Sequence, residues 1–535
     1  MTSTGSHFRA RAAIGAALLM ALALLAAACS SSKPAAARAP ACTTPPAAAP
    51  ALKGGSPYGS WPYPNAELDN ARVAPGSTIS SANVSELRQA WTFRLTGQGA
   101  TNVEYAGSLA ANPVVTDGVV YIQDLEADVY AIDLATGHLK WEYRVGIPEA
   151  SGPGPDGVAV ACGVVYGDTS TAVFALNAAN GKPYWVDSNL LSSGQGKFEI
   201  QPQVASGRLY LASAYGDGPG GGVLFALNAS TGGVLWRFNT VPGEDSAVRA
   251  TGAGAGGAWE TPLVGSDGSV TFGIGNPYQS PATAIAHPSA LLYTDSEVNL
   301  NAATGKLRWY YQAVPDDFFD WDMQASPIAA TIGGAPAVIG AGKMGYVYAM
   351  NAQTGKLLWK TPVGEHNGND NDSVAALHHD STLTAPFTAL PGSLGGVLTD
   401  VALADGSIYV ATVDWPITWT KMTQVDGGAV GGAQTGEVEA LSLATGKVEW
   451  DTKVPSMPLG AATVSNNLVF TTLFNGVLIA LSRSTGAIVY RQTLPTSTNA
   501  PISIAGNTVL VPAGGPRVSS TQSGGDPQVV AYTVP

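Results

Sequence analysis

Charged side chains are scarce in this chain of 535 residues. Asp, Glu, Lys and Arg make up 12% of it, about half of the 25% that is usual in globular proteins. So few charges cannot cover many surface helices. Because 45% of the residues are hydrophobic, the shortage does not indicate disorder. The 64 glycines and 36 prolines predict a turn-rich, mostly β protein. A net charge of −13 repels phosphate backbones, so we expect no nucleic-acid partner.

Cysteine and long hydrophobic runs are also rare. Three cysteines exclude a disulfide framework. A disulfide between Cys42 and Cys162 can form but is not the favoured state. Beyond the N-terminal region no segment reaches 18 consecutive apolar residues, so we expect no transmembrane helix there.

The N-terminal region has the order of an export signal. Arg9 and Arg11 precede an apolar run that ends in small residues before Cys29, which predicts a lipoprotein signal peptide over residues 1–28. Cys29 would then carry the lipid and anchor the exported protein to the membrane. The alternative is a plain secretory signal in which Cys29 is incidental. Residues 29–57 are rich in Ala, Pro and Ser and predict an extended tether. The folded body then spans 58–535.

A short unit recurs seven times along the body. It reads VYAIDLATGHLKW at residues 129–141 and VYAMNAQTGKLLW at residues 347–359. Each copy has an apolar strand, a turn that ends in glycine, and an aromatic residue four positions later. The seven glycines are Gly137, Gly181, Gly232, Gly305, Gly355, Gly446 and Gly486. Such a turn joins two strands in a hairpin. The spacing of the copies fits four-stranded propeller blades of about 40–50 residues, with insertions.

The two ends of the body complement each other. Residues 84–95 resemble an outer strand with Trp91, whereas residues 499–535 supply inner strands only. Joining them makes an eighth blade and protects the sheet edges. We therefore predict an all-β, eight-bladed β-propeller closed by its N- and C-terminal strands. A stack of separate sandwiches would not explain the two half-blades.

Motifs for several common chemistries are missing. Two GxGxxG strings, at residues 216–221 and 252–257, do not lie between a strand and a helix, so they do not indicate dinucleotide binding. No CxxCH occurs for covalent haem. The Asx-rich stretch 366–372 misses the EF-hand ligand pattern and is interpreted as a solvated loop, with a metal site as the alternative. Residues 378–380 (His-His-Asp) are interpreted in the same way.

Four carboxylates lie within seven residues, among large aromatic side chains. They are Asp316, Asp317, Asp320 and Asp322, and their burial would require a cation or protonation. About forty residues earlier, Asn276 in a Gly-Asn-Pro turn offers an amide oxygen. Oxygen ligands of this kind hold hard cations. The sequence thus predicts a metal site, with a structural cluster that caps a blade as the alternative.

These residues resemble the pyrroloquinoline quinone (PQQ) dependent alcohol dehydrogenases, which are exported eight-bladed propellers. The similarity covers nearly the whole body, and its most specific block runs in order from Gly-Asn-Pro at Asn276 through LLYT at residues 291–294 to TGKLRWYYQ and the Pro-x-Asp-x-x-Asp run. The resemblance implies an enzyme that oxidises a small alcohol or sugar and passes the electrons to a separate acceptor. It also implies two cofactors, PQQ and a calcium or lanthanide ion.

The resemblance also implies roles for single residues. Asn276 matches a metal ligand, Asp320 the catalytic Asp, and Asp322 an extra acid that accompanies lanthanide in the family. Asp217 falls where the family has a metal-ligand Glu. The cofactor-binding positions are Trp259, under the quinone ring, and Lys343, against the quinone oxygens.

The sequence departs from the family at several of these positions. Cys162-Gly163 stands where the family has adjacent cysteines, Asp168 near a quinone-binding Arg, and Ala110 at a Glu. Asp217 is one methylene shorter than Glu. These departures support an alternative function, a non-catalytic propeller lipoprotein that serves as an envelope scaffold or a binding protein.

Overall fold

The structure is a computed structural model, and it divides the chain into residues 1–37 and the unit Arg38–Pro535. Only residues of the second unit are described. They are residues 38–41, 59–95, 107–145, 154, 156–192, 194–214, 220–241, 254–287, 291–369, 383–429, 434–515 and 525–535. Asp217 and Cys29 lie outside these residues, as do residues 370–372 and 378–380 of the two Asx- and His-containing stretches.

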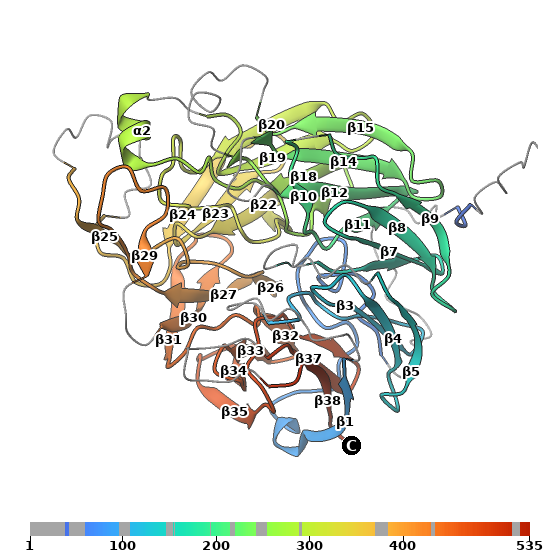
Figure 1. Ribbon diagram of the computed structural model, residues 1–535. Helices are drawn as coiled ribbons and strands as arrows, with labels where there is room; N and C mark the ends of the chain where they lie inside the picture. Colours follow the sequence, from blue (N-terminus) through green and yellow to red (C-terminus); the bar gives the residue numbers. More distant parts are fainter. Residues whose placement is uncertain are drawn as a thin grey trace, which may run out of the picture. The chain divides into compact units, whose positions relative to one another are not determined.

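Eight antiparallel sheets of at least four strands follow one another around a centre, as the order of colours in Figure 1 shows. Blades 1 to 4 are β2 (Val114–Thr116), β3 (Val119–Gln123), β4 (Val129–Asp133), β5 (Leu139–Tyr143); β6 (Ala159–Ala161), β7 (Val164–Asp168), β8 (Val173–Asn177), β9 (Pro183–Asp187); β11 (Gln203–Ala205), β12 (Arg208–Ala214), β14 (Val223–Asn228), β15 (Val234–Asn239); and β17 (Leu263–Val264), β18 (Ser269–Gly273), β19 (Ser296–Asn301), β20 (Leu307–Gln312). Blades 5 to 8 are β21 (Ile328–Ile332), β22 (Ala335–Gly342), β23 (Tyr346–Asn351), β24 (Leu357–Pro362); β26 (Ala402–Ala404), β27 (Ser407–Asp414), β30 (Thr435–Ser442), β31 (Val448–Val454); β32 (Thr463–Ser465), β33 (Leu468–Leu473), β34 (Val477–Ser482), β35 (Ile488–Thr493); and β36 (Ser503–Ala505), β37 (Thr508–Ala513), β38 (Gln528–Thr533), β1 (Arg88–Arg94).

The eighth blade joins the two ends of the body. Strand β1 pairs with β38 in antiparallel register from Arg88 opposite Thr533 to Arg94 opposite Gln528, and the two strands lie side by side in Figure 1. The eight-bladed propeller, closed by its N- and C-terminal strands, is therefore confirmed. Closure leaves no blade without neighbours on both sides, which removes edges that would otherwise pair with other chains.

Tryptophan and glycine link each blade to the next. The indole N–H of each repeat tryptophan donates to a backbone carbonyl of the following repeat, at 2.8–3.1 Å. Its ring packs on the glycine of that repeat, where an added Cβ would lie only 2.6–2.9 Å away. The same seven glycines have φ between 68° and 75°, so glycine serves both the turn and the close packing.

The last repeat ends in tyrosine for a structural reason. Tyr490 on β35 faces the eighth blade, where β38 and β1 come from opposite ends of the chain and no Thr-Gly hairpin joins them. The tyrosine therefore has no repeat glycine to pack on. Its ring stays half-buried, and it lies against the cluster that includes Val84 and Val530.

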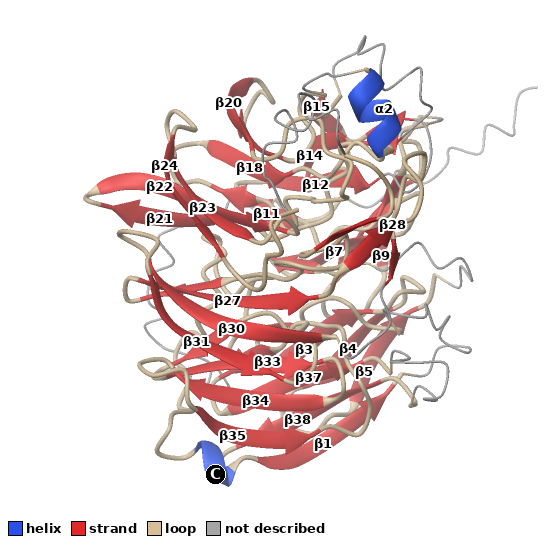
Figure 2. Cartoon of the chain, turned by 90° about the vertical axis from the view of Figure 1, so that its left-hand side faces the viewer, coloured by secondary structure: helices blue, strands red, loops and turns tan. Residues whose placement is uncertain are grey.

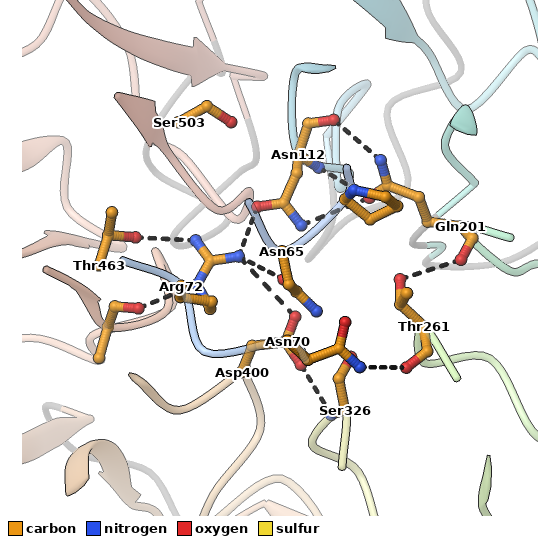
Figure 3. A network of polar contacts seen from close by, with 12 residues as sticks. Asn65, Asn70, Arg72, Asn112, Gln201, Thr261, Ser326, Asp400, Thr463 and Ser503 are labelled. Atoms are coloured by element: carbon orange, nitrogen blue, oxygen red, sulfur yellow. Dashed lines mark hydrogen bonds and ion pairs between the residues drawn. The ribbon is translucent and has the colours of Figure 1, made fainter. Parts of the chain in front are cut away.

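A segment before the first strand fills the centre of the ring. Arg72 is fully buried, and all its N–H groups are used: Nε donates to Ala462 O (2.9 Å), and the two terminal nitrogens donate to Asn65, Asn112, Thr463 and Ile502 at 2.6–3.0 Å (Figure 3). Asn70 reaches the carbonyls of Thr261 and Pro327 from the same segment. Blades 1, 4, 5, 7 and 8 thus meet on one short piece of chain.

Strands dominate the structure, and among the described residues the only helices are η1 (Val84–Glu86) and α2 (Pro281–Ala286) (Figure 2). Two small sheets are added to the ring: β13 (Gly220–Gly221) pairs in parallel with β16 (Gly254–Ala255), and β25 (Phe387–Ala389), β28 (Ile417–Trp419) and β29 (Gly428–Ala429) form the other. The first sheet joins the described parts of the two glycine-rich strings, without a strand-to-helix turn. No described helix has the length and apolar character that a membrane span requires.

Two expectations for the first part of the chain change. Cys162 is disulfide-bonded, which corrects the expectation that a disulfide is not favoured; Cys29 and Cys42 lie outside the described residues. Residues 38–41, expected in the tether, include Ala39, which is buried and donates its N–H to Ser230 O at 3.0 Å. A piece of the expected tether therefore packs on blade 3.

Candidate functional site

A cavity of about 560 Å³ lies within the propeller, a size typical of small-molecule sites. Trp259, Lys343 and Asp322 line it together. They come from three parts of the chain: the segment before β17, the turn after β22, and the loop between β20 and β21. The structure thus brings together three residues that the resemblance assigned to one site.

Lys343 connects the acidic loop to the cavity. Its Nζ lies 3.1 Å from Asp320 Oδ2 and 2.5 Å from Asp322 Oδ2. Burial alone would lower the pKa of Lys343, but Asp320 and then Asp322 outweigh burial and the pKa is raised. Burial, together with the neighbouring Asp322, raises the pKa of Asp320 well above its usual range, although Lys343 acts in the opposite direction.

Asn276 joins this group through its backbone. Its N–H donates to Asp322 Oδ1 at 2.7 Å, while its own side-chain Oδ1 is buried and has no hydrogen-bond partner among the described residues. Gly275 makes the approach possible, because a Cβ there would lie 2.7 Å from Asp322 Oδ1 and 2.8 Å from the Trp259 ring. The turn after β18 therefore requires glycine next to Asn276.

The four carboxylates of the loop have different surroundings. Asp317 accepts the N–H groups of Phe319 and Trp321, each at 2.8 Å, and these bonds stabilise the conformation of the loop. Asp316 accepts Gln279 Nε2 at 2.6 Å. Only Asp320 and Asp322 reach Lys343. Two of the four carboxylates thus hold the loop or its neighbour Gln279, and the other two pair with Lys343.

Stacked aromatic rings bury the loop. Phe319 stacks on Trp321 with centroids 4.0 Å apart, and it meets Trp419 edge-on at 5.6 Å. Phe387 stacks on Trp419 in turn, so the small sheet of β25, β28 and β29 covers the loop. Asp320 keeps 14% of its side chain exposed, whereas Asp322 keeps none. Asp320 therefore keeps some accessible surface, whereas the wholly buried Asp322 is the carboxylate of this loop that lines the cavity.

The Asp320 backbone is strained, with φ at 64°. A residue with a Cβ rarely adopts this left-handed conformation, and functional sites are where such strain is commonly found. The hydrogen bonds that Asp317 accepts on either side of it hold the turn.

Other cavity residues escaped the sequence analysis. Asn112 and Gln201 line the cavity and are joined by the Gln201 Nε2 bond to Asn112 O at 3.1 Å; Thr261 and Ser326 continue the polar ring around the centre (Figure 3). The sequence does contain a pattern that marks these four residues, because each of them directly precedes a proline at the start of an inner strand. The repeated polar-Pro pair marks positions that face the axis.

The cavity wall carries more acidic than basic side chains. Glu199, Glu260 and Asp400 line it with Asp322, against Lys197 and Lys343. Lys197 pairs with Glu199. Burial, followed by the nearby Asp400, raises the pKa of Glu260 well above its usual range. Ala110, which the resemblance matches to a Glu of the family, also lines the cavity.

The expected position of the missing cysteine pair is wrong. Cys162 and Gly163 form the exposed hairpin turn between β6 and β7, at positive φ, and they do not line the cavity. Their turn is equivalent to Asp117-Gly118 in blade 1. The repeat spacing, which aligns these two turns, could have shown this from sequence. Asp168 is buried at the end of β7, and burial raises its pKa, with Asp156 and Glu199 adding to the shift.

Comparison with known proteins shows which enzymes the chain is similar to. It is 27% identical over 486 residues to the quinoprotein alcohol dehydrogenase PedH of Pseudomonas putida strain KT2440, covering 79% of this chain and 80% of PedH. It is 28% identical over 376 residues to the quinohemoprotein alcohol dehydrogenase of Comamonas testosteroni, covering 63% of this chain and 51% of that protein. The chain thus spans about half the length of the second relative.

Solved structures share the fold. The crystal structure of the Comamonas testosteroni quinohemoprotein alcohol dehydrogenase has a TM-score of 0.76 at 23% identity, covering 89% of this chain and 80% of the other. A europium-containing methanol dehydrogenase has a TM-score of 0.72 at 18% identity, covering 89% and 98%.

Two family matches divide the body. Residues 434–532 match the family described as outer membrane protein assembly factor BamB. Residues 61–394, well over half of the chain, match the family described as glucose/ethanol/alcohol dehydrogenase, beta-propeller domain. The chain therefore belongs to the PQQ-dependent alcohol dehydrogenase family of oxidoreductases.

Proposed function

We propose that this protein is an exported, lipid-anchored quinoprotein dehydrogenase that oxidises an alcohol or a sugar with PQQ and a calcium or lanthanide ion. One observation carries the proposal. Asn276 Oδ1 and Asp320 Oδ1 are buried acceptors without a hydrogen-bond partner among the described residues, and both lie in the group that Asp322 and Lys343 tie to the cavity. Buried acceptors without donors are expected where a cation binds.

The residues present fit a hard cation. Asn276, Asp320 and Asp322 offer an amide oxygen and carboxylate oxygens, the ligand types that calcium and lanthanides take. Asp217 would add a fourth ligand but lies outside the described residues. A cation would neutralise the carboxylates that now hold Lys343, whose ammonium could then donate to an anionic group in the cavity. Trp259 offers an aromatic face on the cavity wall.

The chemistry of the chain's own residues is acid–base. PQQ, when bound, supplies the capacity to accept a hydride. Asp320 can take the proton of a substrate hydroxyl, because its carboxylate is partly exposed.

Location and partners follow from the sequence. The signal peptide over residues 1–28 and a lipid on Cys29 would place the enzyme on the membrane, facing away from the cytoplasm. Since the chain has no CxxCH motif for covalent haem, its electrons would go to a separate acceptor. An alternative is a non-catalytic scaffold, which the BamB match over residues 434–532 and the acidic cavity wall favour.

Replacement of the proposed base tests the activity. Asp320→Asn keeps the size and the turn, so we expect an unchanged unfolding midpoint but a fall in dye-linked alcohol oxidation of about 10²–10⁴-fold. Asp316→Asn is the matched control: Asp316 lies in the same loop, also at positive φ, but its carboxylate accepts Gln279 Nε2, whereas Asp320 pairs with Lys343. Turnover retained by Asp320→Asn would remove Asp320 from the mechanism.

A further inference from the structure

A second group of acidic side chains lies on blade 6, outside the cavity. In the antiparallel register, Thr412 on β27 is opposite Glu437 on β30, which is opposite Lys453 on β31. One row along, Glu439 is opposite Asp451. Residues opposite each other share one face of a sheet, and Asp414 lies two residues beyond Thr412 on that face. The sheet thus presents four carboxylates together.

A loop of blade 5 covers this face. The N–H of Gly364, which follows β24, donates to Glu439 Oε1 at 2.6 Å, and the N–H of Glu365 donates to Asp414 Oδ1 at 3.1 Å. Glu365 adds a fifth carboxylate. Because Asp414, Glu437 and Glu439 keep 6%, 3% and 3% of their surface exposed, water does little to stabilise their charges.

The carboxylate oxygens form two groups, and each group is spaced for a metal ion. Ligand atoms of Glu365, Asp414 and Glu437 all lie within 4.8 Å of one another, and so do those of Glu437, Glu439 and Asp451. Calcium binds oxygen at about 2.4 Å, so two ligands on opposite sides of the ion are at most about 4.8 Å apart. Glu437 is the residue that the two groups share.

Among the residues that the structure describes, little positive charge faces this group. Lys453 pairs with Glu365 at 3.0 Å and with Glu437, but its side chain is 60% exposed, and it is one charge against five. Carboxylates held this close together and out of water repel one another unless a cation lies between them.

An independent observation points to a ligand. Thr412 has no exposed surface, and its Oγ1 has no hydrogen-bond partner among the described residues. It faces the same gap as the carboxylates: a Cβ built on Gly364 would lie 3.2 Å from Thr412 Oγ1 and 3.3 Å from Asp414 Oδ1. A buried hydroxyl that lacks a donor can offer its oxygen to a cation.

We propose that blade 6 carries a second divalent-cation site, centred on Glu437, that takes calcium and ties the blade to the loop after β24. Its ligands are carboxylate oxygens around Glu437 and the hydroxyl of Thr412. The site is independent of the cavity and of the proposed dehydrogenase activity. Its role is structural, because a bound ion removes the repulsion between the carboxylates at the junction of blades 5 and 6 and is shared by ligands from both.

Calcium counting tests the site. The purified protein is equilibrated at about 1 mM calcium, where weak protein calcium sites fill, and bound calcium is measured by mass spectrometry of the metal. We expect Glu437→Gln to bind one calcium fewer per chain than the wild type. Glu449→Gln is the matched control, because Glu449 is an exposed carboxylate on the neighbouring strand β31, where it accepts the hydroxyl of Ser407; this variant should bind as many calcium ions as the wild type. Equal counts in Glu437→Gln and the wild type overturn the proposal.

A second variant guards against a misfolded Glu437→Gln. Lys453→Met removes an exposed ammonium that competes with the ion for Glu437, so the calcium affinity of this site should rise several-fold. The readout is a calcium titration that follows the thermal unfolding midpoint. An unchanged calcium dependence in Lys453→Met also overturns the proposal. Asn276→Ala alters only the cavity site, so it should leave the calcium count of the blade 6 site unchanged. This variant therefore separates a failure of the blade 6 site from a failure of the proposed enzyme.

Discussion

At the scale of single residues, the candidate site depends on charges held out of water. Lys343 pairs with two carboxylates, and the backbone of Asn276 holds the inner one in place. The acid cluster and Asn276 could be predicted as one site from sequence because residue type alone limits their chemistry. Which two of the four carboxylates pair with Lys343 could not be predicted, since that depends on the turn at Asp320 and on the backbone hydrogen bonds that Asp317 accepts.

Asp168 should make stability depend on pH. Burial, then Asp156 and Glu199, raise its pKa in the folded protein well above 3.8. The stability that the protonated form provides is complete below about pH 4 and is lost as the pH rises toward the folded-state pKa. Asp168→Asn cannot ionise, so its thermal midpoint should match the wild type at pH 4 and exceed it at pH 8. A constant difference between the two proteins across this range would refute the assignment.

At the scale of elements, the repeat decides the fold. The turn glycine and the aromatic four residues later could be recognised in sequence, because a local hairpin and its packing recur in every blade. The partner of each tryptophan could not be read from one repeat, since it is the glycine of the next repeat. The position of Cys162 could also be predicted from the repeat, because its turn between β6 and β7 is equivalent to the turn at Asp117-Gly118 in blade 1.

Gly305→Ala tests the contact between blades 3 and 4. The left-handed backbone costs a residue with a Cβ about 1–2 kcal/mol, and the new Cβ would lie 2.7 Å from the Trp236 ring, which adds repacking. Gly268→Ala, in the same blade, is the control: its φ is 78° and nothing lies within 4 Å of the new Cβ. Gly305→Ala should lower the thermal midpoint clearly more than Gly268→Ala. Equal shifts would mean that the close packing contributes nothing.

At the scale of the whole molecule, one buried arginine ties distant blades together. Arg72 joins side chains and carbonyls from blades 1, 7 and 8 to its own segment. Sequence analysis assigned no role to this segment, because its partners lie up to 430 residues away and no local pattern marks them. The polar-Pro pairs that begin the inner strands were the only hint of a polar centre.

Removal of Arg72 should weaken the ring as a whole. Arg72→Met leaves buried acceptors without donors, which we expect to lower the free energy of unfolding by about 3–5 kcal/mol. Arg94→Met removes an exposed ion pair with Asp526 and should cost less than about 1 kcal/mol. Chemical unfolding of both variants measures the difference. Similar stabilities would show that the central network is not a main support of the propeller.

Binding of PQQ to the purified protein tests the central claim most directly. The titration follows quenching of tryptophan fluorescence with calcium, with lanthanum, or with a chelator, and Trp259→Phe identifies the share that comes from the cavity wall. We predict saturable binding at micromolar PQQ that requires a metal ion, with lanthanum more effective than calcium because of Asp322. The absence of saturable quenching with either ion would contradict the proposal of a quinoprotein dehydrogenase.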